Sequence, residues 1–128
     1  MLFKTSPHVD FIMNIFRNVP DAKVFAAGAE ICRKDESGDA MFAVVEGEVE
    51  IIRGEKILGT VGPGEFFGEM SLLDKTPRAA TARAKTDCRI VSIDERRFIF
   101  LVQETPYFAL EMMRTISSRL RERLQEKW

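Results

Sequence analysis

The sequence predicts a mainly β fold, a jelly roll or barrel, with helices at both ends. Between residues 23 and 94, seven or eight short apolar runs alternate with turns that contain glycine, a pattern typical of such architectures. On either side of this region, apolar residues recur three or four positions apart, which indicates amphipathic helices. We therefore expect one domain over 1–128, with an N-terminal helical segment (1–22), a β region (23–94) and C-terminal helices (95–128).

Composition narrows the class of protein. Apolar residues make up 45% and charged residues 30% of the chain, a balance typical of soluble globular domains. The net charge of −1 gives no basic field that would recruit nucleic acid. We see no signal peptide and no apolar run near the roughly 20 residues that span a bilayer. The expected location is the cytoplasm, without membrane contact.

The few cysteines and the single histidine exclude several kinds of site. Cys32 and Cys88 are far apart in sequence, which argues against a disulfide scaffold, a zinc site or an iron–sulfur cluster and predicts two free thiols. A nucleophile–histidine set or a metal-dependent cupin-type enzyme would depend on His8 alone. We therefore expect no enzyme, no metal and no cofactor.

The first helix is expected to begin with Ser6 as its cap and Pro7 at the first helical position. An apolar face follows at helical spacing: Val9, Ile12, Met13 and Phe16. Residues 18–21, which include Pro20, end it.

The β region is expected to contain strands at 24–26, 31–32, 41–45, 48–53, 56–61, 81–84 and 89–93. Turns are expected at 27–30, 35–39, 46–48 and 54–55. The last of these, Gly54-Glu55, is a hairpin turn.

Two helices are expected at the C-terminal end. A short one runs from Asp94-Glu95 to about Val102, and the longest begins at Thr105-Pro106 and continues to the end. An apolar stripe lies along the second, formed by Ala109, Met113, Ile116, Leu120 and Leu124 and extended by Trp128 at the end of the chain. About 22 residues give roughly 33 Å of helix, more than a small β-roll needs. We therefore favour a dimer seam, with packing of the stripe on the roll as the alternative.

The stretch 64–81 is where a ligand is expected. Backbone N–H groups at the start of a short helix favour an anion, and the planar guanidinium of Arg78 matches two phosphate oxygens. Ala79 and Ala80 leave room for a ligand against the main chain, and Glu69 suits a ligand hydroxyl better than a phosphate. These residues together indicate a sugar phosphate with a single negative charge.

Residues 67–73 (FGEMSLL) followed by 76–81 (TPRAAT) resemble the phosphate-binding cassette of cyclic-nucleotide-binding domains. Such domains occur in catabolite-activator-type regulators, protein kinase A regulatory subunits and nucleotide-gated channels. The resemblance covers about a dozen cassette positions and nearly all of the chain. It implies an eight-stranded antiparallel β-roll with the cassette between its sixth and seventh strands.

The resemblance also implies roles for individual residues. Glu69 matches the glutamate that contacts the ribose 2′-hydroxyl, and Arg78 matches the arginine that contacts the cyclic phosphate. Backbone or wall contacts are expected from Gly68, Met70, Ser71 and Ala80. The alternatives are a surface salt bridge for Arg78 and a helix cap for Glu69. We expect Phe66 and Phe67 to belong to the core.

Ala79 bears on which nucleotide is preferred. In the family, a hydroxyl directly after the arginine can bond the guanine of cGMP, and alanine has none. The resemblance therefore favours cAMP, with cGMP or a cyclic dinucleotide as the alternative.

In the resembling regulators the long helix covers the purine and forms a parallel dimer. Polar candidates to meet the base here are Ser117, Ser118, Arg119 and Arg123, and their alternative is solvated helix surface. The leading hypothesis is a sensor in which the nucleotide draws this helix over the base.

The sequence also bears on which partner or domain would respond to nucleotide binding. Only four residues follow Leu124, and we find no helix-turn-helix. We expect no specific DNA binding by this chain alone; it would act as a stand-alone sensor, through an effector protein, or as part of a longer regulator. The alternative function is a ligand-free dimerisation or docking domain of the same fold.

Overall fold

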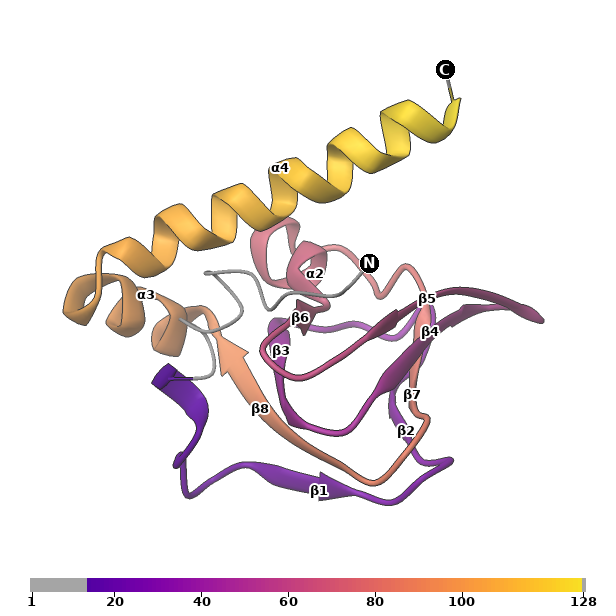
Figure 1. Cartoon of the computed structure of the whole chain (residues 1–128), viewed down its shortest axis with the longest axis horizontal. Coiled ribbons are helices and arrows are strands. Elements are labelled where there is room, and N and C mark those ends of the chain that lie inside the picture. Colours follow the sequence, from indigo (N-terminus) through magenta and orange to yellow (C-terminus); the bar gives the residue numbers. More distant parts are fainter. Residues whose placement is uncertain (1–13, 128) are drawn as a thin grey trace, which may run out of the picture. The chain divides into compact units, whose positions relative to one another are not determined.

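The structure, a computed structural model, describes residues 14–127 (Figure 1). Residues 14–16 are helical and belong to the helix predicted before residue 18. The predicted cap and start of that helix, Ser6 and Pro7, and the histidine His8 lie outside the described residues.

Eight antiparallel strands form two four-stranded sheets, which confirms the predicted β-roll. The first sheet has the order β1 (Lys23–Phe25), β8 (Cys88–Asp94), β3 (Ala40–Glu46) and β6 (Phe66–Phe67). The second has the order β2 (Glu30–Cys32), β7 (Thr81–Ala84), β4 (Val49–Arg53) and β5 (Lys56–Val61). The short helix α2 (Glu69–Asp74) lies between β6 and β7, where the resemblance placed the cassette.

The strand pairs are nested along the chain. β1 pairs with β8, β2 with β7, β3 with β6 and β4 with β5. Because neighbouring strands pair in this nested way, the loop that joins two strands lies beside the loop that joins their two partner strands. In particular, the β2–β3 loop comes beside the end of the β6–β7 connection, where Asp35 N donates to Arg78 O at 2.8 Å.

The core lies between the sheets and is built from alternate strand residues. One buried cluster consists of Val44, Val49, Val61, Phe67, Ala82, Ala84, Cys88 and Ile90. Phe66 and Phe67 are 2% and 4% exposed, which confirms that both are core residues. They form β6, a strand too short for its own sequence signal, and the Phe67 ring stacks on Phe42 with centroids 5.2 Å apart.

Most predicted strand limits agree with the structure to within a residue or two. The first strand was placed one residue late, because Lys23 pairs with Ile90 and Phe25 with Cys88. Strand ends depend on the partner strand, which local patterns do not contain.

The second compact unit of the described chain begins at Arg96 and contains helices. The helix α3 (Glu95–Glu104) continues two residues beyond its predicted end, and α4 (Tyr107–Lys127) begins two residues after its predicted start. Phe98 of α3 meets Phe108 of α4 edge to face, with ring centroids 5.5 Å apart. Neither these helices nor any other helix in 14–127 is long and apolar enough to cross a membrane.

Gly47 makes the turn between β3 and β4 possible. Its φ of 90° is unfavourable for any residue with a side chain. A Cβ atom there would overlap the carbonyl oxygen of Asp87 and lie 2.9 Å from the Cα of Cys88. These neighbours are backbone atoms, so they cannot move aside without disturbing β8.

We expect Gly47→Ala to lower the free energy of unfolding by more than the about 1–2 kcal/mol typical of a left-handed non-glycine residue, because the backbone overlap adds to the strain. Urea unfolding followed by circular dichroism measures this. Gly28→Ala is the matched control, since Gly28 has a φ of 92° but nothing within 4 Å of its added Cβ. Equal losses in the two variants would contradict the role of the overlap.

Candidate functional site

The seven cassette residues predicted to bind the ligand lie on the connection between β6 and β7. Gly68 precedes α2 with a φ of 78°, a left-handed conformation that glycine tolerates. Lys75, also left-handed with a φ of 58°, ends the helix, and its N–H donates to Ser71 O at 3.1 Å. The helix has only six residues, so the chain returns at once toward Arg78.

Arg78 is buried, with 7% of its surface exposed. Its Nη1 donates to the carbonyl oxygen of Gly68 at 3.1 Å, and its guanidinium carbon lies 5.1 Å from the centroid of the Phe42 ring. Among residues 14–127 no carboxylate forms an ion pair with it. Arg78 is therefore not a surface arginine in a salt bridge, which was the alternative interpretation of the sequence.

The guanidinium retains most of its hydrogen-bonding capacity. It has five N–H donors, and the bond to Gly68 O is the one formed with the described residues. Within the described chain, no fully buried side-chain nitrogen or oxygen lacks a hydrogen-bond partner. The nitrogens Nε and Nη2, which make no bond with the described residues, are therefore not fully enclosed by the protein. A buried cation with unused, accessible donors is suited to bind an anion that carries several oxygens.

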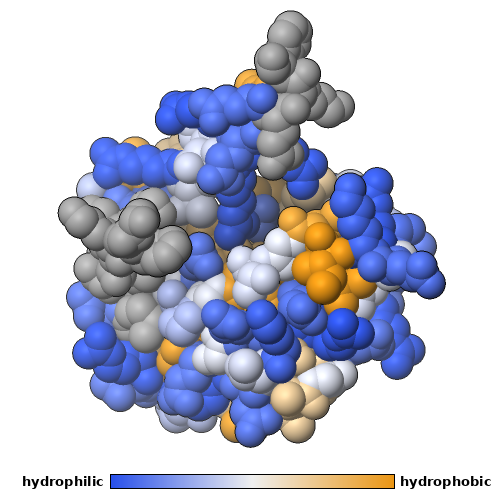
Figure 2. Space-filling view, turned by 45° about the vertical axis from the view of Figure 1, so that its right-hand side comes forward, coloured by the Kyte–Doolittle hydropathy of each residue, from blue (hydrophilic) through white to orange (hydrophobic). Residues whose placement is uncertain are grey.

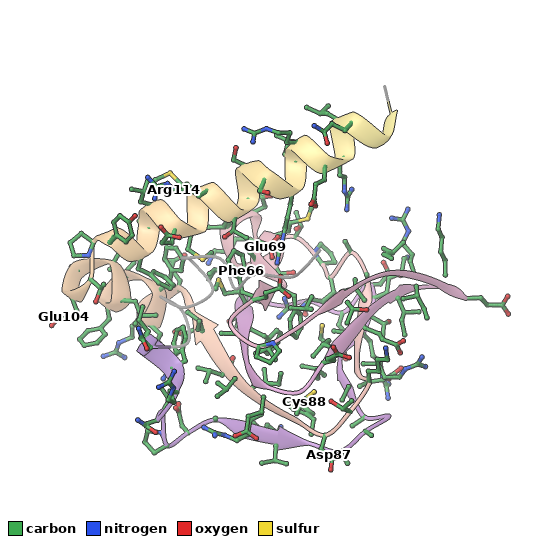
Figure 3. All side chains as sticks on the ribbon, in the orientation of Figure 1. Phe66, Glu69, Asp87, Cys88, Glu104 and Arg114 are labelled. Carbon is green, nitrogen blue, oxygen red and sulfur yellow. The ribbon has the colours of Figure 1, made fainter. Side chains whose placement is uncertain are left out.

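The other cassette residues differ in exposure. Glu69 is half-buried in the first turn of α2, next to Gly68 in the chain and near the end of β6 (Figure 3). Ser71 is buried at 2% exposure, whereas Met70 is 54% exposed. Ala79 is exposed and Ala80 is half-buried. The contacts bring Gly68 and Arg78 together directly.

Sequence reasoning missed the β2–β3 loop, residues 33–39, which it described only as a turn. Arg78 N donates to Glu36 O at 2.8 Å, so this loop is bound to the cassette arginine. Cys32, just before the loop, is also near: burial raises the pKa of its thiol, and the charge of Arg78 lowers that pKa in part. No local motif marks the loop, because its proximity to Arg78 comes from the pairing of β2 with β7.

The polar candidates on α4 have different surroundings. Ser117 and Ser118 are exposed and line a shallow hollow of about 370 Å³ together with Met113, Arg114 and Arg121. Arg119 is half-buried, and Arg123 is exposed and forms no ion pair with the described residues.

The apolar stripe predicted on the long helix is not its buried face. Met113, Leu120 and Leu124 are 61%, 59% and 50% exposed, while Ala109 and Ile116 are half-buried. The buried residues of α4 are instead Phe108, Glu111 and Met112. The carboxylate of Glu111 accepts a hydrogen bond from Arg114 at 3.1 Å, which explains how a charged residue occupies that face. Apolar spacing alone did not distinguish the two faces.

Metal ligands do not gather in the part of the chain that the structure describes. Residues 14–127 contain no group of three or more histidine, cysteine, aspartate or glutamate side chains placed to hold a metal ion. Asp87, directly before β8, and Cys88, the first residue of β8 (Figure 3), have structural contacts. The carboxylate of Asp87 accepts a hydrogen bond from Ala27 N at 2.9 Å, and Cys88 Sγ donates to Glu48 O at 3.2 Å.

Comparison with known proteins agrees with this geometry. The sequence pattern of the cyclic nucleotide-binding domain matches residues 22–105, about two thirds of the chain, including β6, α2 and β7. This chain belongs to the cyclic nucleotide-binding domain family. The resemblance seen in residues 67–81 is thereby confirmed at the level of the family.

Individual relatives are named for different activities. The chain is 40% identical over 98 residues to a cyclic nucleotide-gated potassium channel of Mesorhizobium japonicum, covering 77% of this chain and 27% of the channel. It is 31% identical over 119 residues to the cyclic AMP receptor protein of Thermus thermophilus, covering 89% and 53%. It thus spans about a quarter to a half of the length of these relatives.

Solved structures show the same fold. The catabolite activator protein of Thermus thermophilus superimposes with a TM-score of 0.77 at 30% identity, covering 94% of this chain and 58% of that one. A protein from a cyclic-GMP-dependent signalling pathway that regulates bacterial phytopathogenesis has a TM-score of 0.73 at 29% identity, covering 91% and 94%. The names of these proteins refer to a catabolite activator in one case and to a cyclic-GMP-dependent pathway in the other.

The surroundings of Arg78 predict an unusual effect on stability. Replacing a buried charge that lacks an ionic partner by an apolar side chain of similar length removes a desolvation cost. We expect Arg78→Met to leave the free energy of unfolding unchanged or to raise it, as measured by urea unfolding without ligand. A decrease of more than about 1 kcal/mol in the free energy of unfolding would show that the hydrogen bond to Gly68 and the cation–π contact with Phe42 outweigh that desolvation cost.

Proposed function

We propose that this chain is a cyclic-nucleotide sensor that binds cAMP. The observation that carries the proposal is the guanidinium of Arg78, which is buried, has no carboxylate partner among the described residues and keeps donors open to solvent. The cyclic phosphate of the nucleotide has a single negative charge and two free oxygens, which suit these donors.

The rest of the cassette would hold the sugar and line the site. Glu69 accepts hydrogen bonds from the ribose 2′-hydroxyl, as the matching glutamate of the family does. The wall and backbone contacts are assigned to Gly68, Met70, Ser71, Ala79 and Ala80. The exposed face of Ala79 supports this arrangement, because a larger side chain beside Arg78 would compete with the ligand for space.

The choice of cAMP over cGMP rests on Ala79. Relatives with both nucleotides in their names share this fold, so the fold alone does not decide. Alanine cannot offer guanine the hydroxyl contact that favours cGMP, and preference is a difference between two affinities. We propose no cofactor. The names of the relatives, a channel and transcriptional regulators, support regulation over catalysis.

The long helix α4 would convert binding into a signal. Ser117, Ser118, Arg119 and Arg123 are the candidates to meet the base, and the exposure of Ser117, Ser118 and Arg123 leaves their side chains accessible to a ligand. A nucleotide that binds one helix position more tightly than another shifts the population toward it. The exposed side chains of Met113, Leu120 and Leu124 would form the seam of a homodimer. An effector protein, or further domains in a longer chain, would read the change.

In titration calorimetry we expect the wild-type chain to bind cAMP saturably and cGMP more weakly. We expect Arg78→Ala to lose at least about tenfold in affinity for cAMP, because charge-assisted hydrogen bonds contribute about 1.5–3 kcal/mol. Arg53→Ala removes the same charge from an exposed arginine with no partner among the described residues, so its affinity should match the wild type. No heat and no thermal shift with either nucleotide would contradict the sensor and favour the docking domain.

We expect the wild-type chain to sediment as a dimer and Leu120→Glu to sediment as a monomer, because an unpaired carboxylate in a seam costs several kcal/mol. Analytical ultracentrifugation over a range of concentrations measures this. Leu58→Glu introduces the same charge at an exposed leucine on β5 and should leave the dimer intact. A wild-type monomer at every concentration would exclude the seam.

A further inference from the structure

The β2–β3 loop holds the main chain of Arg78 from both sides. Asp35 N donates to Arg78 O and Arg78 N donates to Glu36 O, both at 2.8 Å. Two residues past Ala79, Thr81 Oγ1 accepts a hydrogen bond from Lys34 N at 3.0 Å. The backbone from which the guanidinium extends is therefore attached to a loop about 40 residues earlier in the sequence.

Internal hydrogen bonds give the loop a defined shape. Arg33 N donates to Glu36 Oε1 at 2.8 Å, and Glu36 N donates to Arg33 O at 3.2 Å. Asp35 adopts a left-handed conformation with a φ of 72°, which aspartate tolerates better than most residues. A loop closed in this way can position its neighbours.

The same loop also bounds the side chain of Arg78. A Cβ atom at Gly38 would overlap Nε and would lie 2.6 Å from Cζ and 2.7 Å from Nη2. A Cβ atom at Gly68 would lie 2.8 Å from Nη1. The guanidinium thus lies against two residues that lack side chains, with the Phe42 ring as a third neighbour. Non-bonded heavy atoms normally stay about 3.5–4.0 Å apart, so neither glycine position can carry a side chain while Arg78 stays in place.

The two glycines differ in why they must be glycine. Gly68 has a φ of 78°, so any side chain there would also strain the backbone. Gly38 is not among the residues with positive φ, so its backbone accommodates alanine. The effect of Gly38→Ala would therefore come from its Cβ alone, and the atoms displaced would be those of the guanidinium.

We propose that the β2–β3 loop is part of the ligand site and that Gly38 is a positioning residue, which sets the place of the Arg78 guanidinium by leaving the space it occupies. This inference rests on the proposed function in that Arg78 binds the cyclic phosphate. It assigns a role in binding to a residue outside the cassette. It also predicts that affinity falls as residue 38 becomes larger, although residue 38 itself does not touch the ligand.

The first test is titration calorimetry of the full chain with cAMP, for the wild type, Gly38→Ala and Gly59→Ala. Gly59 also lacks a positive φ and has nothing within 4 Å of an added Cβ, so it controls for the change from glycine to alanine. We expect Gly38→Ala to lose about tenfold or more in affinity and Gly59→Ala to stay within about twofold. Equal affinities of the wild type and Gly38→Ala would overturn the proposal.

The second test distinguishes positioning from a general structural role. Gly38→Ala is made in the Arg78→Ala background, and thermal unfolding without ligand is measured for all four combinations. We expect any loss of Tm caused by Gly38→Ala to disappear when Arg78 is alanine, because the overlapping atoms are then absent. A loss of the same size in both backgrounds would overturn the proposal, including where Gly38→Ala alone is too unstable for calorimetry.

These two tests separate this inference from the proposed function. A wild-type chain that binds neither cAMP nor cGMP contradicts the sensor, whereas the thermal cycle reports on the contact between Gly38 and Arg78 without any ligand. If the wild type binds, Gly38→Ala binds equally well and the cycle shows no coupling, the sensor stands and the positioning role falls.

Discussion

The nested pairing of strands is the constraint on which the rest of the β-roll depends. Because β2 pairs with β7 and β3 with β6, the connections between β2 and β3 and between β6 and β7 must come together. That meeting place contains Arg78, Gly68 and the loop 33–39. Main-chain hydrogen bonds join the loop to Arg78, and the guanidinium of Arg78 donates to Gly68 O. These residues lie on connections whose ends are held by paired strands, so the geometry of the proposed site would be prepared before a ligand arrives.

The buried guanidinium of Arg78 explains why the site is suited to an anion and not to a neutral ligand. A charge withdrawn from water is costly unless a partner compensates it. Here the protein supplies one carbonyl oxygen and one aromatic ring, both weaker than a carboxylate. The remaining compensation would come from the ligand, and binding energy is thereby concentrated on one residue. Gly38 and Gly68 have no side chains, so the guanidinium of Arg78 can lie against both residues.

In the helical part of the chain, the long helix α4 has separate buried and exposed faces. In α4 the buried residues Phe108, Glu111 and Met112 and the exposed residues Met113, Leu120 and Leu124 occupy different faces. A helix with apolar side chains on an exposed face has surface to offer to another chain. Periodicity identified the helix and its apolar stripe, which was favoured as a dimer seam, but it did not identify the other face, which is buried within the chain, because several sets of positions satisfy the same spacing. Glu111, a buried carboxylate bound by Arg114, would not be chosen from sequence as a core position.

By itself, the sequence determined the elements and the family. Short strands punctuated by glycine, the cassette at 67–81 and two C-terminal helices are local patterns, and each is visible without knowing its neighbours. The tertiary structure alone decided the burial of Arg78, the brief strand Phe66–Phe67 and the contact of Gly38 with the guanidinium. These features depend on residues far apart in the sequence, such as Phe42 with Phe67 and Asp35 with Arg78, meeting through strand pairing. A local pattern contains no information about such a meeting, because the pairing of distant strands sets it.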